Sequence, residues 1–138
     1  MRKSVLLILA LFLISAAGAV LAQEQGAAAQ NKPISWDNWR EAKAAAEKLD
    51  NEGKFVEALQ YYLEYARQAE GLGDRELVAW GKNNAAYMII KRHKLDGTVD
   101  LAPAKKLLEE AMAIDAASED CKKCLEMNLE YVNLFLKK

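Results

Sequence analysis

Between Phe55 and Ala69 the apolar side chains recur at the spacing of one helical face. The stripe consists of Phe55, Ala58, Leu59, Tyr62, Tyr65, Ala66 and Ala69. Residues three and four apart lie on the same side of an α-helix, so this pattern is typical of an amphipathic helix. Gly53 stands directly before the stripe and is suited to ending a preceding helix. The sequence therefore predicts two helices that are joined by a tight turn at Gly53.

The same periodicity predicts helices along the whole chain from residue 35 onward. We expect five, which begin after Ser35, at about Lys54, after Asp74, near Asp100 and after Ser118. The two serines and the aspartate are good N-cap residues, because their side-chain oxygens accept from the first helical N–H groups. No segment shows the period-two alternation of a strand. The expected fold class is all-α, with antiparallel helix-turn-helix pairs.

The first 22 residues have the layout of a secretory signal. Arg2 and Lys3 precede an apolar run from Val5 to Ile14, and small residues lead to Ala22. We expect cleavage after Ala22, with Ala19 as the alternative. The apolar run is shorter than the roughly 20 residues of a membrane span, although an uncleaved anchor stays open. These features predict a periplasmic or secreted protein with no stable membrane span after cleavage.

Two further regions follow the signal. Residues 23–34 have almost no large apolar side chains, so we expect a flexible linker there. Residues 35–138 are expected to form the helical domain. Without Arg2 and Lys3, 17 of the 19 basic residues remain against 20 acidic ones. That balance argues against nucleic acid as a partner, because nucleic acid favours a basic face.

The helix pairs resemble tetratricopeptide repeats. In the first pair, residues 39–72, the resemblance rests on Gly53 at the turn, then Phe55, Ala58 and Tyr62. Its first helix matches in part, since Ala42 stands where Trp is typical. The resemblance implies a protein that binds another protein or a peptide and performs no catalysis.

The second pair, residues 77–115, also departs from the motif. Trp80 and Tyr87 have the expected spacing of seven, but Asn83 and Asn84 replace the usual Leu-Gly. Ala104, Leu108 and Ala111 match the second helix, and the turn over residues 91–100 is about eight residues too long. The last helix resembles the opening half of a third unit. The resemblance covers about 100 residues as two and a half degenerate units.

In such repeats the first helices of successive units line a concave groove. Carried over by position, the resemblance implies a partner-binding groove made of Arg40, Lys43, Glu47, Asp50, Val78, Lys82, Met88, Lys123 and Met127.

The last helix is apolar around much of its circumference. Leu125, Leu129, Val132 and Leu136 form one stripe, and Tyr131, Leu134 and Phe135 form a second. A helix of this kind is expected to be covered on more than one side. We therefore expect a homodimer or partner contact through Leu129, Tyr131, Val132, Leu134, Phe135 and Leu136. The alternative is that the linker or the 91–100 loop covers this helix.

Cys121 and Cys124 form the residue pair that is most able to take part in chemistry. In an exported protein a Cys-x-x-Cys pair favours a disulfide, here a local clip at the start of the last helix. A redox pair is a second interpretation, because a helix N-terminus and Lys122 and Lys123 favour thiolate. Two free thiols are a third. A redox accessory protein that uses these cysteines is therefore one functional alternative. A structural subunit of an envelope assembly is another.

The sequence indicates no other chemistry. His93 is the single histidine, and with the two cysteines it leaves a tetrahedral zinc site one ligand short. We expect His93 to be a cation near a helix C-terminus rather than a base. Phosphate-binding loops, nucleophile elbows and catalytic carboxylate pairs are not recognisable. We therefore expect no metal, no cofactor and no enzymatic activity.

Overall fold

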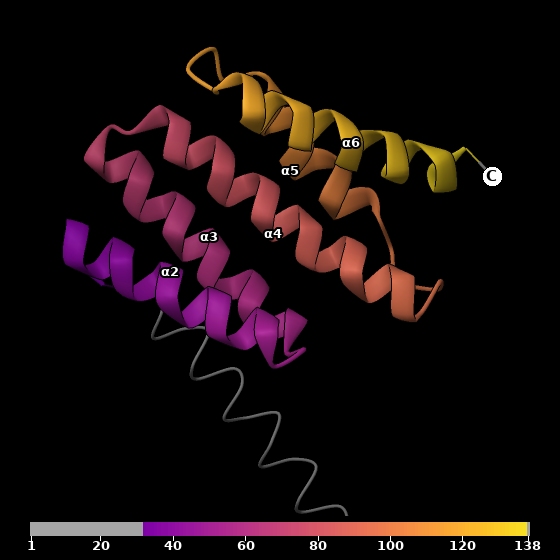
Figure 1. Ribbon diagram of the computed structural model, residues 1–138, viewed down its shortest axis with the longest axis horizontal. Coiled ribbons are helices and arrows are strands. Elements are labelled where there is room, and N and C mark those ends of the chain that lie inside the picture. The colour runs from indigo at the N-terminus through magenta and orange to yellow at the C-terminus, as the bar shows by residue number, and fades with distance from the viewer. Residues whose placement is uncertain (1–31, 138) are drawn as a thin grey trace, which may run out of the picture.

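The computed structural model describes residues 32–137, and within this range the chain forms five α-helices and no strand (Figure 1). The helices are α2 (Trp36–Asn51), α3 (Phe55–Leu72), α4 (Arg75–Leu95), α5 (Ala102–Met112) and α6 (Glu119–Leu136). The predicted all-α fold is confirmed. The signal and most of the linker expected from the sequence lie outside the described residues. Within residues 32–137 no helix is long and apolar enough to cross a membrane.

Three polar side chains start helices where the sequence predicts them. Ser35 Oγ accepts from the Asn38 N–H at 3.1 Å, and Asp74 Oδ1 accepts from the Leu77 N–H at 3.0 Å. Ser118 Oγ accepts from the Cys121 N–H at 3.4 Å. Each cap satisfies an N–H that the first helical turn leaves unpaired. Local sequence therefore determines where α2, α4 and α6 begin.

Two glycines reverse the chain between the first three helices. Gly53 and Gly73 have φ values of 74° and 77°, in the left-handed region that favours glycine. Gly73 is the C-cap of α3, and its N–H bonds to the Ala69 and Glu70 carbonyls. α2 and α3 therefore end close to these glycines, so that α3 packs back against α2 and α4 packs back against α3.

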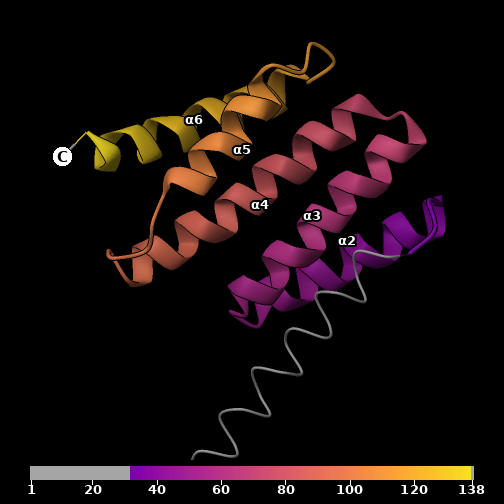
Figure 2. The ribbon, with the colours of Figure 1, turned by 180° about the vertical axis from the view of Figure 1, so that it is seen from behind.

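The helices pack mainly against their neighbours in sequence. α3 lies between α2 and α4, and α4 lies between α3 and the pair formed by α5 and α6 (Figures 1 and 2). α6 is the nearer member of that pair in Figure 1, and α5 is the nearer one in Figure 2. α4 thus packs mainly against α3, α5 and α6, and its Lys91 also reaches Asp50 of α2.

Two hydrophobic clusters hold this arrangement together. The larger joins α4, α5 and α6 through buried residues that include Ile90, Leu108, Leu125 and Val132. The smaller joins α2, α3 and α4 through Ala46, Ala58, Tyr62, Ala85 and Met88. Alanines occupy the contact points, which lets helix backbones approach closely while large side chains fill the remaining space. α4 contributes to both clusters and links the two halves.

The segment before α2 is bonded to α3. The Gln68 side chain is fully buried, accepts from the Ser35 N–H at 2.9 Å and donates to the Pro33 carbonyl at 3.0 Å. Arg67 donates to the Lys32 carbonyl at 2.6 Å and pairs with the buried Glu64. Lys32–Ile34 are the only linker residues that the structure describes. We call residues 32–35 the strap.

Candidate interaction groove between α4 and α6

A groove of about 440 Å³ runs between α4 and α6. Its lining residues are Trp80, Asn83, Asn84, Tyr87, Ile90 and Lys94 from α4, and Cys124, Met127, Asn128 and Tyr131 from α6. Aromatic and aliphatic side chains form most of this lining, with three amides and one ammonium group among them. Concave sites with apolar walls and a few polar groups are typical of ligand-binding sites.

Three asparagines connect the two walls of the groove. Asn128 Nδ2 donates to Asn83 Oδ1 at 2.9 Å, which joins α6 to α4. Asn83 Nδ2 in turn donates to Asn84 Oδ1 at 3.4 Å. Asn83 is only 4% exposed, whereas Asn84 and Asn128 are half-buried. The buried amide therefore holds two amides that reach the groove.

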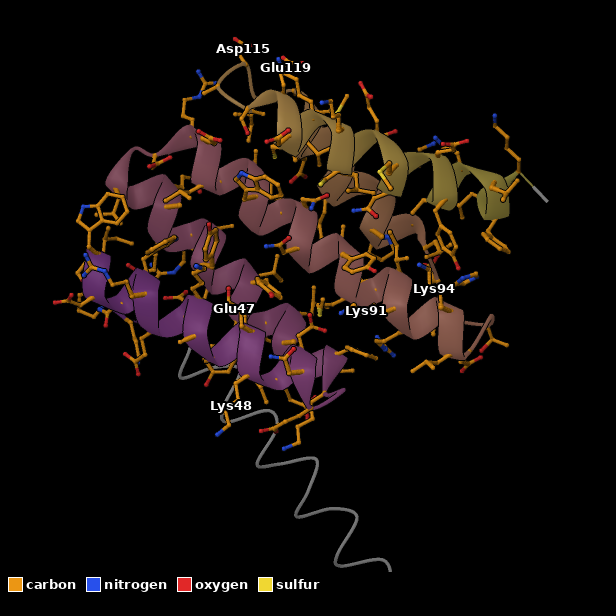
Figure 3. All side chains as sticks on the ribbon, in the orientation of Figure 1. Glu47, Lys48, Lys91, Lys94, Asp115 and Glu119 are labelled. Carbon is orange, nitrogen blue, oxygen red and sulfur yellow. The ribbon has the colours of Figure 1, made fainter. Side chains whose placement is uncertain are left out.

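Lys94 brings the charge to the groove. Its Nζ lies 5.6 Å from the ring centre of Tyr87 and 5.1 Å from that of Tyr131, so the cation bridges rings of α4 and α6. Among the ten lining residues it is the single charged side chain. No carboxylate of residues 32–137 lies within ion-pair distance of it. Figure 3 labels Lys91 and Lys94 on the C-terminal half of α4.

His93 contacts Tyr131, which is part of the groove wall. His93 Nδ1 lies 2.9 Å from the Tyr131 hydroxyl, and the His93 ring packs edge-on against Tyr131 and Phe135 at 5.8 and 4.8 Å between ring centres. His93 is buried near the end of α4, where the sequence predicts a cation rather than a base. It fixes the orientation of Tyr131.

The structure does not bring the nine groove residues implied by the repeat resemblance into one surface. On α2, Arg40 pairs with Asp37, and Lys43 pairs with Glu47 at 3.6 Å. Asp50 of α2 pairs with Lys91 of α4. None of the four implied α2 residues lines the α4–α6 groove, although Asp50 reaches α4 through Lys91.

The residues carried over onto α4 face its neighbours. Met88 is 1% exposed within the smaller cluster, and Val78 is also buried. Lys82 pairs with Glu110 of α5. Val78 and Lys82 line a separate pocket beside Glu110, whereas the α4 residues that line the α4–α6 groove include Trp80, Asn83, Asn84 and Tyr87.

α6 contributes one implied residue to the groove. Met127 lines it and is 70% exposed, whereas Lys123 is an exposed side chain that lies 4.0 Å from Asp120. The asparagines were missed as site residues, although their signal was present. Asn83 and Asn84 stand where the repeat motif has an apolar residue and a glycine, and a polar pair at such a position needs partners.

The cysteines are unpaired in the structure, so the predicted disulfide is not found there. Cys121 is fully buried in the larger cluster, whereas Cys124 is half-buried and lines the groove, so the thiols point into different surroundings. Burial, followed by the charges of Cys124 and Glu76, raises the pKa of Cys121 to about 11. Burial thus opposes the thiolate that the sequence favours at Cys121.

The face of α6 expected to bind another copy is divided by the fold. Val132 is fully buried, and Leu129 and Tyr131 pack against the larger cluster. Leu134, Phe135 and Leu136 are 60%, 38% and 43% exposed. The remaining apolar surface is thus confined to the last turn of the helix, and Val132 is unavailable to a partner.

Within residues 32–137 no group of three or more His, Cys, Asp or Glu side chains is arranged to hold a metal ion. No family model, no curated protein and no solved structure matches this chain.

Proposed function

We propose that this protein is a non-catalytic interaction module that binds a segment of another protein in the α4–α6 groove. The observation that carries the proposal is one concave surface that combines three aromatic side chains with two amides. The aromatic residues are Trp80, Tyr87 and Tyr131, and the amides are those of Asn84 and Asn128. Aromatic side chains supply large contact areas, and amides supply hydrogen bonds without the desolvation cost of charges.

The helix pairs support a repeat-like origin for this surface. α2 packs with α3 and α4 packs with α5, and α6 then packs on α4 and α5 as an added half unit. We read this order as two and a half tetratricopeptide-like units that present α4 and α6 side by side. The N-terminal signal expected from the sequence would place the module outside the cytoplasm.

The geometry gives a redox function less support than the groove does. Cys121 is fully buried in the larger cluster, where burial raises its pKa to about 11, and it is not bonded to Cys124. Cys124 is then better understood as part of the groove wall.

Site-specific photo-crosslinking in the native cell tests the proposal. A photoreactive amino acid in place of Met127 stands at the groove, whereas the same residue in place of the neighbouring Glu126 stands outside the groove lining on an exposed position. We expect a discrete protein adduct from position 127 that is absent from position 126. Asn84→Arg, which fills the groove, should abolish that adduct. Equal crosslinking from both positions, or none from 127, would contradict the proposed function.

A further inference from the structure

Asn83 determines which polar atoms the groove offers to a ligand. Its Oδ1 takes a hydrogen from the Asn128 amide, and its own amide gives a hydrogen to Asn84 Oδ1. Each contact uses one polar atom of the neighbouring amide and leaves the other polar atom of that amide available. Asn128 presents Oδ1 as an acceptor, and Asn84 presents Nδ2 as a donor.

Neither of these two atoms has a partner among residues 32–137. They come from opposite walls of the groove, since Asn84 is on α4 and Asn128 is on α6. One donor and one acceptor are what a peptide group needs, because it carries one N–H and one carbonyl. A ligand that left both atoms desolvated and unpaired would lose the free energy of two hydrogen bonds.

We infer that the groove binds an extended peptide segment through its main chain. The peptide N–H donates to Asn128 Oδ1, and a peptide carbonyl accepts from Asn84 Nδ2. This inference rests on the proposed function and names the chemistry of its partner. Main-chain recognition in this form tolerates many side chains, so the selectivity of the site comes from its walls and its charge.

The remaining lining defines which peptides fit. Trp80, Tyr87 and Tyr131 provide apolar walls for a side chain next to the bound peptide group. Lys94 is the one charged residue of the lining, so a carboxylate on the peptide finds a complementary partner there. We expect segments that combine an apolar residue with a nearby Asp, Glu or terminal carboxylate. A polyanion such as a nucleic acid would need several cations, and this lining has one.

A random dodecapeptide library displayed on phage is the probe. It is selected against the purified protein, and enriched peptides are synthesised and their affinities measured by fluorescence anisotropy. The variants are Asn84→Leu and Asn128→Leu, with Asn133→Leu as the matched control, because Asn133 lies on α6 outside the groove lining. We expect each groove variant to weaken binding about three- to ten-fold, the effect of one hydrogen bond. The control should bind as the parent does.

N-methylation of the peptide, one position at a time, identifies the bound N–H. We expect one methylated position to lose affinity about three- to ten-fold against the parent. The same peptide should lose nothing further against Asn128→Leu, because the acceptor is already gone. If N-methylation instead weakened binding by changing the shape of the peptide, the loss of affinity would also appear with Asn128→Leu.

The outcomes separate the inference from the proposed function. Peptides that lose binding in Asn84→Arg, yet bind Asn84→Leu and Asn128→Leu as tightly as the parent, would overturn main-chain recognition and leave the groove as a protein-binding site. If no enriched peptide depends on the groove, the proposed function itself fails. Enriched peptides without an acidic group would overturn the role assigned to Lys94.

Discussion

Lys91 of α4 donates to both carboxylate oxygens of Asp50 on α2, with Nζ–O distances of 2.6 and 2.9 Å. These two helices are not neighbours in sequence, and α3 lies between them. The same Nζ lies 5.5 Å from the ring centre of Phe55 and 5.0 Å from that of Tyr87. Because Tyr87 also lines the groove, this ion pair connects the first helix to the wall of the candidate site.

Asp50→Asn should destabilise the fold by about 1–2 kcal/mol, because it removes a charged acceptor from a two-bond pair. The pair is well shielded, with side-chain exposures of 27% for Lys91 and 18% for Asp50. Glu47→Gln is the control, since its pair with Lys43 is about half exposed and is expected to contribute less than about 0.5 kcal/mol. Urea unfolding measures both, and equal losses would contradict the role of the Asp50–Lys91 pair.

Gly71→Ala should release the strap. A Cβ at Gly71 would lie 2.7 Å from Ile34 Cγ1 and 2.8 Å from its Cδ1 and Cγ2, so Ile34 would have to move. Alanine also favours the helix by about 1 kcal/mol over glycine. We therefore expect Gly71→Ala to raise the free energy of unfolding in the Ile34→Ala background. In the parent background the same change should be less favourable, and the difference between the two effects should be about 1–2 kcal/mol. Additive effects in denaturant unfolding would show that Ile34 does not seat on α3.

Gly81→Ala should be more damaging. Its Cβ would lie 2.6 Å from Tyr65 Cδ1, 2.8 Å from Ala66 Cβ and 3.0 Å from the Ala66 Cα, which belongs to the α3 backbone. α3 and α4 would have to separate, at a cost of about 1–3 kcal/mol for overpacking. Gly97→Ala is the matched control, because nothing lies within 4 Å of the added atom there. The midpoints of thermal unfolding compare the two, and a parent-like Gly81→Ala would mean that the helices are not in close contact.

Alkaline solution should unfold the domain through buried hydroxyls. Burial, then the charges of Asp50 and Glu47, raises the pKa of Tyr62 to about 12, above the value of 10.0 for a free tyrosine. The unfolded chain therefore releases this proton first, and stability is lost as pH rises from 10 to 12. At pH 11 the loss from Tyr62 is on the order of 1 kcal/mol. Tyr62→Phe should reduce the fall in unfolding free energy between pH 9 and 11 by that amount, which urea unfolding at the two pH values measures.

The fold was largely predictable because its determinants are local. The N-caps Ser35, Asp74 and Ser118 each act within three residues, and Gly53 reverses the chain by itself. The apolar stripe of α3 also follows from helical spacing alone, and most of it is buried. These are properties that a sequence shows without knowledge of which helices meet.

The groove could not be derived in this way. Each residue turns a helix by about 100°, so an assignment by repeat position does not determine which way each side chain faces, and Met88 lies buried in the smaller cluster. The contact of Asn83 with Asn128 spans 45 residues, and that of Gln68 with Ser35 spans 33. Such pairs depend on how α4 meets α6 and how the strap meets α3. The polar pair Asn83–Asn84, which stands where the repeat motif has Leu-Gly, was the one signal that pointed to the site.

The two cysteines should differ sharply in reactivity. Alkylation by iodoacetamide needs a thiolate, and Cys121 is fully buried with its pKa raised to about 11, whereas Cys124 is half-buried and lines the groove. At pH 8 we expect Cys124 to be alkylated at least about ten-fold faster than Cys121 in the folded protein, with equal rates after denaturation. Peptide mass spectrometry of timed samples measures both rates. A peptide bound in the groove should slow the reaction of Cys124 and leave that of Cys121 unchanged. Protein that takes up label only after treatment with a reductant would show that the two sulfurs are bonded in the cell.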